Sequence, residues 1–86
     1  MYVMAVSTIS DNDKFWGALK KAYSQLPTGA KWILAVGSTD GIKAVNIIQH
    51  DSIAGVESLF EQYASPFGTT EYFEADIANA VGLGKK

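Results

Sequence analysis

The chain has 86 residues, with no cysteine and no arginine, and seven lysines against nine carboxylates give a formal net charge of −2. This length predicts a single domain, residues 1–86, with a thin core that a partner subunit would help to bury, and the lack of cysteine excludes disulfides and thiolate metal sites. A slightly acidic chain without arginine has no basic patch for nucleic acid, and no stretch is long enough to span a membrane, so we expect a cytoplasmic protein with neither partner.

The first part of the chain predicts a strand followed by a helix. Apolar β-forming residues occupy both faces over residues 1–7, as is typical of a central strand. Ser10 is expected to cap the helix that follows, because its hydroxyl can accept hydrogen bonds from the first free backbone N–H groups. Apolar residues from Phe15 to Leu26 then fall on one helical face, and Pro27 ends the helix because it cannot continue the hydrogen-bond ladder.

Two β-rich runs, residues 31–37 and 42–49, predict a hairpin. The turn between them ends at Gly41 and is expected to be either a three-residue loop, residues 39–41, or a two-residue loop. Either loop makes the two runs antiparallel neighbours in a sheet.

The remaining elements are a second helix, a short strand and a tail. Asp51-Ser52 is expected to provide the cap of the second helix, whose apolar residues repeat at helical spacing from Ile53 to Tyr63. Residues 70–76 alternate as a strand, and residues 77–86 form a tail rich in alanine and glycine.

The resulting order, β-α-β-β-α-β, is the split βαβ arrangement of ferredoxin-like domains. Two right-handed crossovers then place both helices on one face of a four-stranded antiparallel sheet with the strand order 4-1-3-2. We therefore predict an α+β fold in which the helices leave the other face of the sheet uncovered.

This uncovered face is expected to be apolar. If the hairpin loop has three residues, the alternation of the strands assigns the following side chains to it: Tyr2, Met4, Val6, Trp32, Leu34, Ile48 and Tyr72, with Asn46, His50, Glu74 and Asp76 among them. A two-residue loop would shift the third strand by one residue and move His50 and Asn46 inward. In either register the face is too apolar for water, and it predicts a homodimer interface.

Short segments spread over nearly the whole chain resemble small bacterial proteins of the dimeric α/β barrel superfamily. These segments are Phe15-Trp16, Leu26-Pro27-Thr28-Gly29, Thr39-Asp40-Gly41, His50-Asp51-Ser52 and Glu71-Tyr72-Phe73-Glu74-Ala75-Asp76. The resemblance implies that two ferredoxin-like sheets pair face to face, with a pocket between sheet and helices or inside the barrel. The superfamily includes cofactor-free monooxygenases, haem-degrading enzymes and muconolactone isomerases. The haem-degrading members carry their catalytic histidine on a helix, whereas His50 ends a predicted strand, and the resemblance assigns no catalytic residue.

Candidates for acid-base catalysis are few. His50 is the single histidine of the chain, and histidine is the side chain best suited to proton transfer near neutral pH. Glu74 and Asp76 alternate onto one strand face with Tyr72 and would serve as acid and base if that face lined a cavity. The structural alternatives are a hydrogen-bonded histidine at the start of the second helix and solvated carboxylates at a sheet edge. His50 and Asp51 have no third ligand at metal-binding spacing, so we expect no metal and no cofactor.

The aromatic residues suggest a ligand site. Trp32 and Tyr2 could stack a planar ligand, and Asn46, His50 and Tyr72 are the other candidates to line its site. The alternative is that the same residues fill the core of a dimer.

Two further aromatic residues, Trp16 and Tyr23, share a stripe beside the apolar face of the first helix. They either widen that face or border a pocket between helix and sheet.

The function that the sequence favours is a homodimeric module that binds a small apolar or aromatic molecule. A cofactor-independent monooxygenase or isomerase, with His50 or Glu74 moving a proton, is the first alternative. A purely structural assembly protein, in which the open face serves only for association, is the second.

Overall fold

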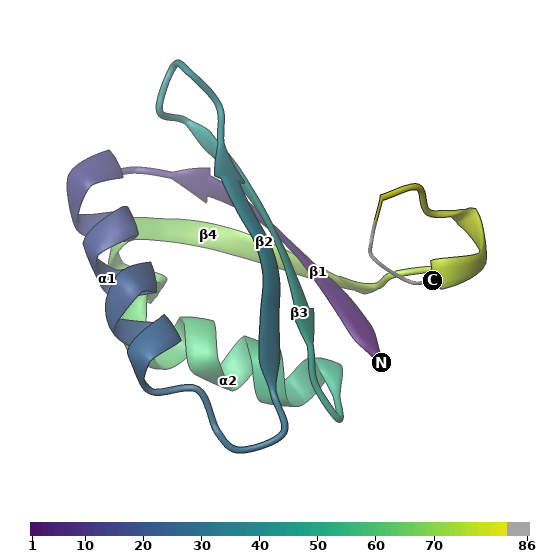
Figure 1. Ribbon diagram of the computed structural model, residues 1–86. Helices are drawn as coiled ribbons and strands as arrows, with labels where there is room; N and C mark the ends of the chain where they lie inside the picture. Colours follow the sequence, from purple (N-terminus) through teal and green to yellow (C-terminus); the bar gives the residue numbers. More distant parts are fainter. Residues whose placement is uncertain (83–86) are drawn as a thin grey trace.

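The computed structural model describes residues 1–82 and contains one four-stranded antiparallel sheet with two α-helices packed on the same face (Figure 1). The elements in chain order are β1 (Tyr2–Ile9), α1 (Asn12–Ser24), β2 (Lys31–Gly37), β3 (Lys43–Gln49), α2 (Ile53–Tyr63), the 3₁₀ helix η1 (Ser65–Phe67), β4 (Gly68–Glu74) and the 3₁₀ helix η2 (Ile77–Asn79). The strand order β2-β3-β1-β4 is the predicted 4-1-3-2 order, counted from the opposite edge, which confirms the α+β ferredoxin-like arrangement. The end of the predicted tail, residues 83–86, lies outside the described residues.

Both helices begin at a side-chain cap. The cap of α1 is Asp11 and not the predicted Ser10: its Oδ1 accepts a hydrogen bond from the backbone N–H of Lys14 at 3.1 Å. A carboxylate is favoured there because it also meets the positive end of the helix dipole. Ser52, the second residue of the predicted Asp51-Ser52 pair, caps α2: its Oγ accepts a hydrogen bond from the backbone N–H of Gly55 at 3.0 Å.

Neither helix of the described chain is long and apolar enough to cross a membrane.

The hairpin between β2 and β3 has a longer loop than the sequence predicts. The backbone N–H of Ser38 donates to the carbonyl oxygen of Lys43 at 2.8 Å, which closes a loop of residues 39–42. A loop of four residues puts each side chain of β3 on the same side of the sheet as a two-residue loop would. Asn46 and His50 therefore point inward, toward the helices. The three-residue alternative, with both side chains on the open face, is wrong.

A β-bulge in β2 changes the facing of that strand partway along its length. Trp32 pairs with Ile48 while Leu34 pairs with Ile47, so Ile33 is one residue more than the opposite strand provides. Trp32 therefore lies on the helix side of the sheet and Leu34 on the open side. The prediction that both lie on the open face is wrong for Trp32 and correct for Leu34.

The edge strand β4 is also turned relative to the prediction. Tyr72 lies opposite Ala5, on the helix side, and Phe73 lies opposite Met4, on the open side. Ile48 likewise lies opposite Val3 on the helix side, where it is fully buried. The open face therefore lacks Tyr72 and Ile48 but gains Phe73 and Ile47, and it remains apolar.

The core lies between the sheet and the two helices. Its fully or nearly fully buried members are Val3, Ala5, Ile9, Phe15, Leu19, Ala44, Ile48, Val56, Phe60 and Ala64. Phe60 of α2 joins this core to two aromatic residues of the sheet, with ring centroids 5.8 Å from Trp32 and 6.0 Å from Tyr72. The core thus supports the edge strands through aromatic contacts.

The Phe15→Ala substitution is expected to lower the free energy of unfolding by about 3–5 kcal/mol, because it leaves a cavity at a fully buried position. Urea denaturation followed by circular dichroism measures this loss. Lys14→Ala, on the exposed neighbouring residue, is the control and should change the same quantity by less than about 0.5 kcal/mol. Equal losses in the two variants would contradict the assigned core.

Candidate functional site

A groove of about 360 Å³ lies between α1 and the edge strand β2. The residues that line it are Trp16, Leu19, Lys20 and Tyr23 of α1 and Trp32, Ile33, Leu34 and Ala35 of β2. Three of the eight are aromatic and one is charged. A volume of this size, with mostly apolar walls, falls within the range of about 300–1,000 Å³ that is typical of small-molecule sites.

Contacts between large rings and the sheet bound the groove on two sides. The ring of Tyr23 meets that of Trp32 across the gap between helix and strand, with centroids 6.2 Å apart. Further along β2, Trp16 lies so close to Gly37 that a Cβ at that position would be 2.8 Å from Cζ2 of the indole. Glycine is thus required at position 37 by close approach, and two aromatic contacts join α1 to β2 on either side of the open space.

The two tryptophans are held by hydrogen bonds to asparagines. The indole N–H of Trp16 donates to Oδ1 of Asn12 at 3.1 Å, one helical turn away. The indole N–H of Trp32 donates to Oδ1 of Asn46 at 3.0 Å, from β2 to the neighbouring strand β3. Both ring orientations are therefore fixed by the protein itself.

Asn46 is the most unusual residue near the groove. It is fully buried, between Ala5 of β1 and Ala35 of β2, and its Nδ2 has no hydrogen-bond partner among the described residues. An unpaired buried donor of this kind costs about 1–3 kcal/mol. Asn46 does not line the groove itself, although Ala35, its pairing partner on β2, does.

The structure separates the other predicted ligand residues from this groove. Tyr2 points to the open face, opposite Gln49 of β3. Tyr72 lines a different pocket of about 250 Å³ beside α2, which it shares with Phe60 and Glu61. Burial raises the pKa of the Tyr72 phenol to about 12, with a smaller contribution from the negative charge of Glu61. The structure therefore brings together Trp32 and Asn46 but places Tyr2 and Tyr72 elsewhere.

His50 lies at the junction of β3 and α2. Its Nδ1 accepts a long hydrogen bond, 3.4 Å, from the backbone N–H of Ser52. The ring packs against Gly55 in the first turn of α2, where a Cβ would overlap Cε1 of the imidazole. His50 borders small pockets beside Pro27 and does not line the groove. These contacts match the structural alternative for this residue.

The two carboxylates predicted on the last strand do not form a pair. Strand β4 ends at Glu74, which is exposed, and Asp76 lies beyond it. Asp76 caps η2: Oδ1 accepts the backbone N–H of Ala78 at 3.0 Å, and Oδ2 accepts Nδ2 of Asn79 at 2.7 Å. The expectation that both carboxylates alternate along one strand is wrong, because the strand begins and ends two residues earlier than predicted. Nowhere in residues 1–82 do three histidine, aspartate or glutamate side chains come close enough to hold a metal ion.

Part of the groove was within reach of sequence reasoning. Trp16 and Tyr23 were expected either to widen the apolar face of the helix or to border a pocket, and both line the groove. The contribution of Lys20 was missed, although it lies four residues after Trp16 and hence on the same side of the helix. Nothing in the sequence pattern marked Ile33, since its place depends on the bulge.

Comparisons with known proteins add no relative. No protein-family model, no curated protein and no solved structure matches the chain. The function is therefore argued from the geometry of the groove and of the open face.

We expect Gly55→Ala to have different effects in two backgrounds, because alanine is a better helix former than glycine but collides with His50. In a His50→Ala background the substitution should raise the free energy of unfolding by about 0.5–1 kcal/mol. In the otherwise unchanged protein the displaced imidazole should cancel or reverse this gain. A double-mutant cycle by urea denaturation measures the coupling, and equal effects in both backgrounds would refute the packing of His50 against α2.

Proposed function

We propose that the protein is a homodimeric small-molecule-binding protein whose groove between α1 and β2 takes an apolar or aromatic ligand. The observation that carries this proposal is the aromatic lining of the groove by Trp16, Tyr23 and Trp32. Aromatic walls favour flat or hydrophobic ligands through stacking and the burial of apolar surface. Membership of the dimeric α/β barrel superfamily and a cytoplasmic location in bacteria belong to the same proposal.

The groove is organised for binding before a ligand arrives. Both indole N–H groups already have acceptors, on Asn12 and Asn46, so neither ring has to find a new polar partner when a ligand packs on it. Trp32 is held further by its contacts with Phe60 and Tyr23. A site that is ordered in advance loses less conformational entropy on binding, which favours affinity.

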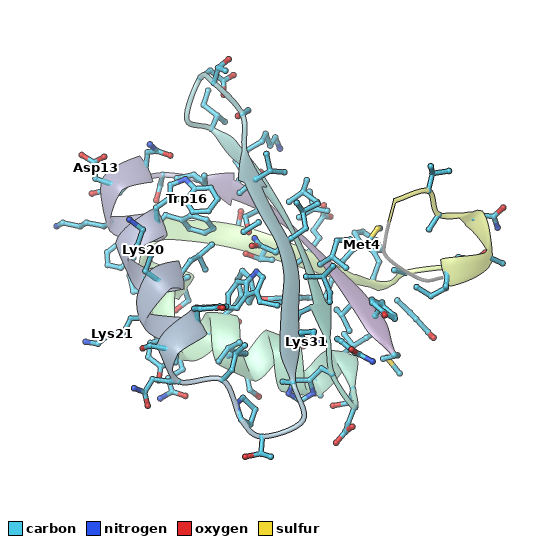
Figure 2. The ribbon with its side chains drawn as sticks, in the orientation of Figure 1. Met4, Asp13, Trp16, Lys20, Lys21 and Lys31 are labelled. Carbon is cyan, nitrogen blue, oxygen red and sulfur yellow. The ribbon has the colours of Figure 1, made fainter. Side chains whose placement is uncertain are left out.

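The open face of the sheet supports the homodimer in this proposal. One row of apolar side chains crosses all four strands: Leu34, Ile47, Met4 and Phe73, from β2 to β4. Leu34 and Phe73 each expose 46% of their surface in the single chain. Figure 2 shows Met4 on the side of the sheet away from the helices. Ile47, which lies between Leu34 and Phe73 in the row, is 8% exposed, so the accessible apolar surface of the row lies mainly toward the two edges of the face. Exposed apolar side chains gathered on one face in this way are typical of a surface that another protein covers.

A second copy of the chain is the partner that fits this face best. The open face carries Lys31 on the edge strand β2 and Glu71 on the opposite edge strand β4, so its two sides carry opposite charge. A two-fold axis parallel to the strands would place the lysine side of one copy over the glutamate side of the other. The open face is therefore complementary to itself, as the interface of a symmetric dimer requires.

The enzyme hypothesis receives no comparable support. A general acid or base has to lie within hydrogen-bond reach of the reacting group. Neither His50 nor Glu74 lines the groove, and Lys20 is the one lining residue with a charge. A purely structural role is less favoured too, because the aromatic side chains that line the groove, Trp16, Tyr23 and Trp32, lie on the helix side of the sheet, away from the surface that association would use.

Filling the groove should weaken binding. Ala35→Phe adds a ring at a position that lines the groove, and we expect the dissociation constant for naphthalene to rise by about tenfold or more. The two indole N–H resonances of Trp16 and Trp32, followed by two-dimensional NMR during a titration, report the binding. Ala54→Phe, on an exposed position of α2, is the matched control and should leave the titration unchanged. If naphthalene does not shift either resonance in the unaltered protein, the proposed site is incorrect.

Phe73→Glu should convert the protein into a folded monomer. Phe73 is half-exposed in the single chain, so the monomer tolerates the charge, whereas a dimer would bury it without a partner. Sedimentation velocity at micromolar concentration measures the change. Tyr23→Glu, on the opposite layer of the molecule, replaces an aromatic residue that is 62% exposed and should remain dimeric. An unaltered protein that sediments as a monomer would disprove the homodimer.

A further inference from the structure

We infer that the ligand of the groove is a monoanion, an aromatic or other hydrophobic carboxylic acid whose carboxylate binds the ammonium group of Lys20. This inference rests on the proposed function, since it assumes that the groove binds a small molecule, and it adds the chemical class of that molecule. Lys20 then becomes the residue that determines specificity.

Lys20 is placed at the mouth of the groove by helical spacing. It follows Trp16 by four residues and precedes Tyr23 by three, so the three side chains share one side of α1. Figure 2 shows Lys20 close to Trp16, whereas the neighbouring Lys21 points away from the sheet. Lys20 lines the groove and Lys21 does not, although both lysines are exposed.

The ammonium group of Lys20 has no carboxylate of this chain to bind. Within residues 1–82 it forms no ion pair at 4.0 Å or less. The positions one helical turn before and after it are Trp16, Gly17, Tyr23 and Ser24, none of which is acidic. The positive charge is therefore available at the edge of an apolar surface, where a carboxylate joined to a hydrophobic body would meet both features at once.

The charged group that lines the groove is a donor. Lys20 offers three N–H donors and no acceptor. A ligand with acceptor oxygens satisfies these donors, whereas an amine or another cation would be repelled by Lys20.

The charge of the site fits one negative charge and not two. Lys20 is the single cation that lines the groove, and the N-terminus of α1 lies at the far end of the helix from Tyr23. Phosphate recognition usually draws on several cations or on backbone N–H groups at a helix start. A carboxylate, with one charge and two acceptor oxygens, matches a single lysine.

Two probes of the same shape test the inference: naphthalene-2-carboxylate and its neutral analogue, naphthalene-2-carboxamide. Their dissociation constants are measured from the indole N–H resonances of Trp16 and Trp32 in the full-length protein. We expect the carboxylate to bind about fivefold more tightly, the range of an exposed ion pair, and the difference to shrink as salt is added. In Lys20→Gln the two probes should bind equally, with the affinity for the carboxamide unchanged.

Lys21→Gln is the matched control, because it removes the same charge from the next residue outside the groove. It should keep the preference for the carboxylate. The inference is overturned if the two probes bind equally to the unaltered protein, or if both glutamine variants lose the preference to the same extent. In those cases binding of unsubstituted naphthalene would still uphold the proposed groove. Failure of naphthalene and both probes to bind would overturn the proposed function as well.

Discussion

One extra residue in β2, Ile33, reverses the alternation of the strand between Trp32 and Leu34. Without this bulge, a strand that presents Leu34 to the open face would present Trp32 to the same face, because successive odd or even positions share a side. With it, the same short strand supplies an aromatic wall to the groove and an apolar end to the row that crosses the open face. Both surfaces on which the proposed function depends therefore follow from one irregularity in hydrogen-bond pairing at a sheet edge.

The inward position of Trp32 also explains why a polar residue is tolerated at the centre of the sheet. Asn46 is fully buried between two alanines, and its carbonyl oxygen receives the indole N–H of Trp32. The small neighbours leave room for the amide, and the hydrogen bond fixes which end of it carries the free NH₂ group. Stability is lost at this point, since that NH₂ group has no partner in the described chain. Such an imbalance is typical of places where a protein keeps a polar group for a purpose other than folding.

The sequence predicts the elements and topology of this fold well. It predicts poorly which side chains of each strand point toward the helices and which point to the open face. The helical spacing that starts at Phe15, the cap at Ser52 and the β-rich runs each depend on local pattern, and the structure confirms them. The first helix nevertheless ends at Ser24, before Leu26 and Pro27. The side of the sheet on which a side chain lies changes with every residue added to or removed from a loop or strand. The loop of residues 39–42 therefore decides which side of β3 is buried. Neither the length of that loop nor the bulge at Ile33 leaves a clear signal in composition. The wall of the groove on α1 could be anticipated from Trp16 and Tyr23, but the wall on β2 could not.

The position of the groove on an edge strand bears on how such a protein can diverge. Strand β2 has only one hydrogen-bonded neighbour in the sheet, β3, and most of its side chains are exposed. Substitutions at Ile33 or Ala35 would alter the shape of the groove and would disturb only the hydrogen bonds between β2 and β3. The buried central strand β1 would be unaffected. The shape of the groove can therefore change through substitutions at a few residues of the sheet edge while the framework of the fold stays the same.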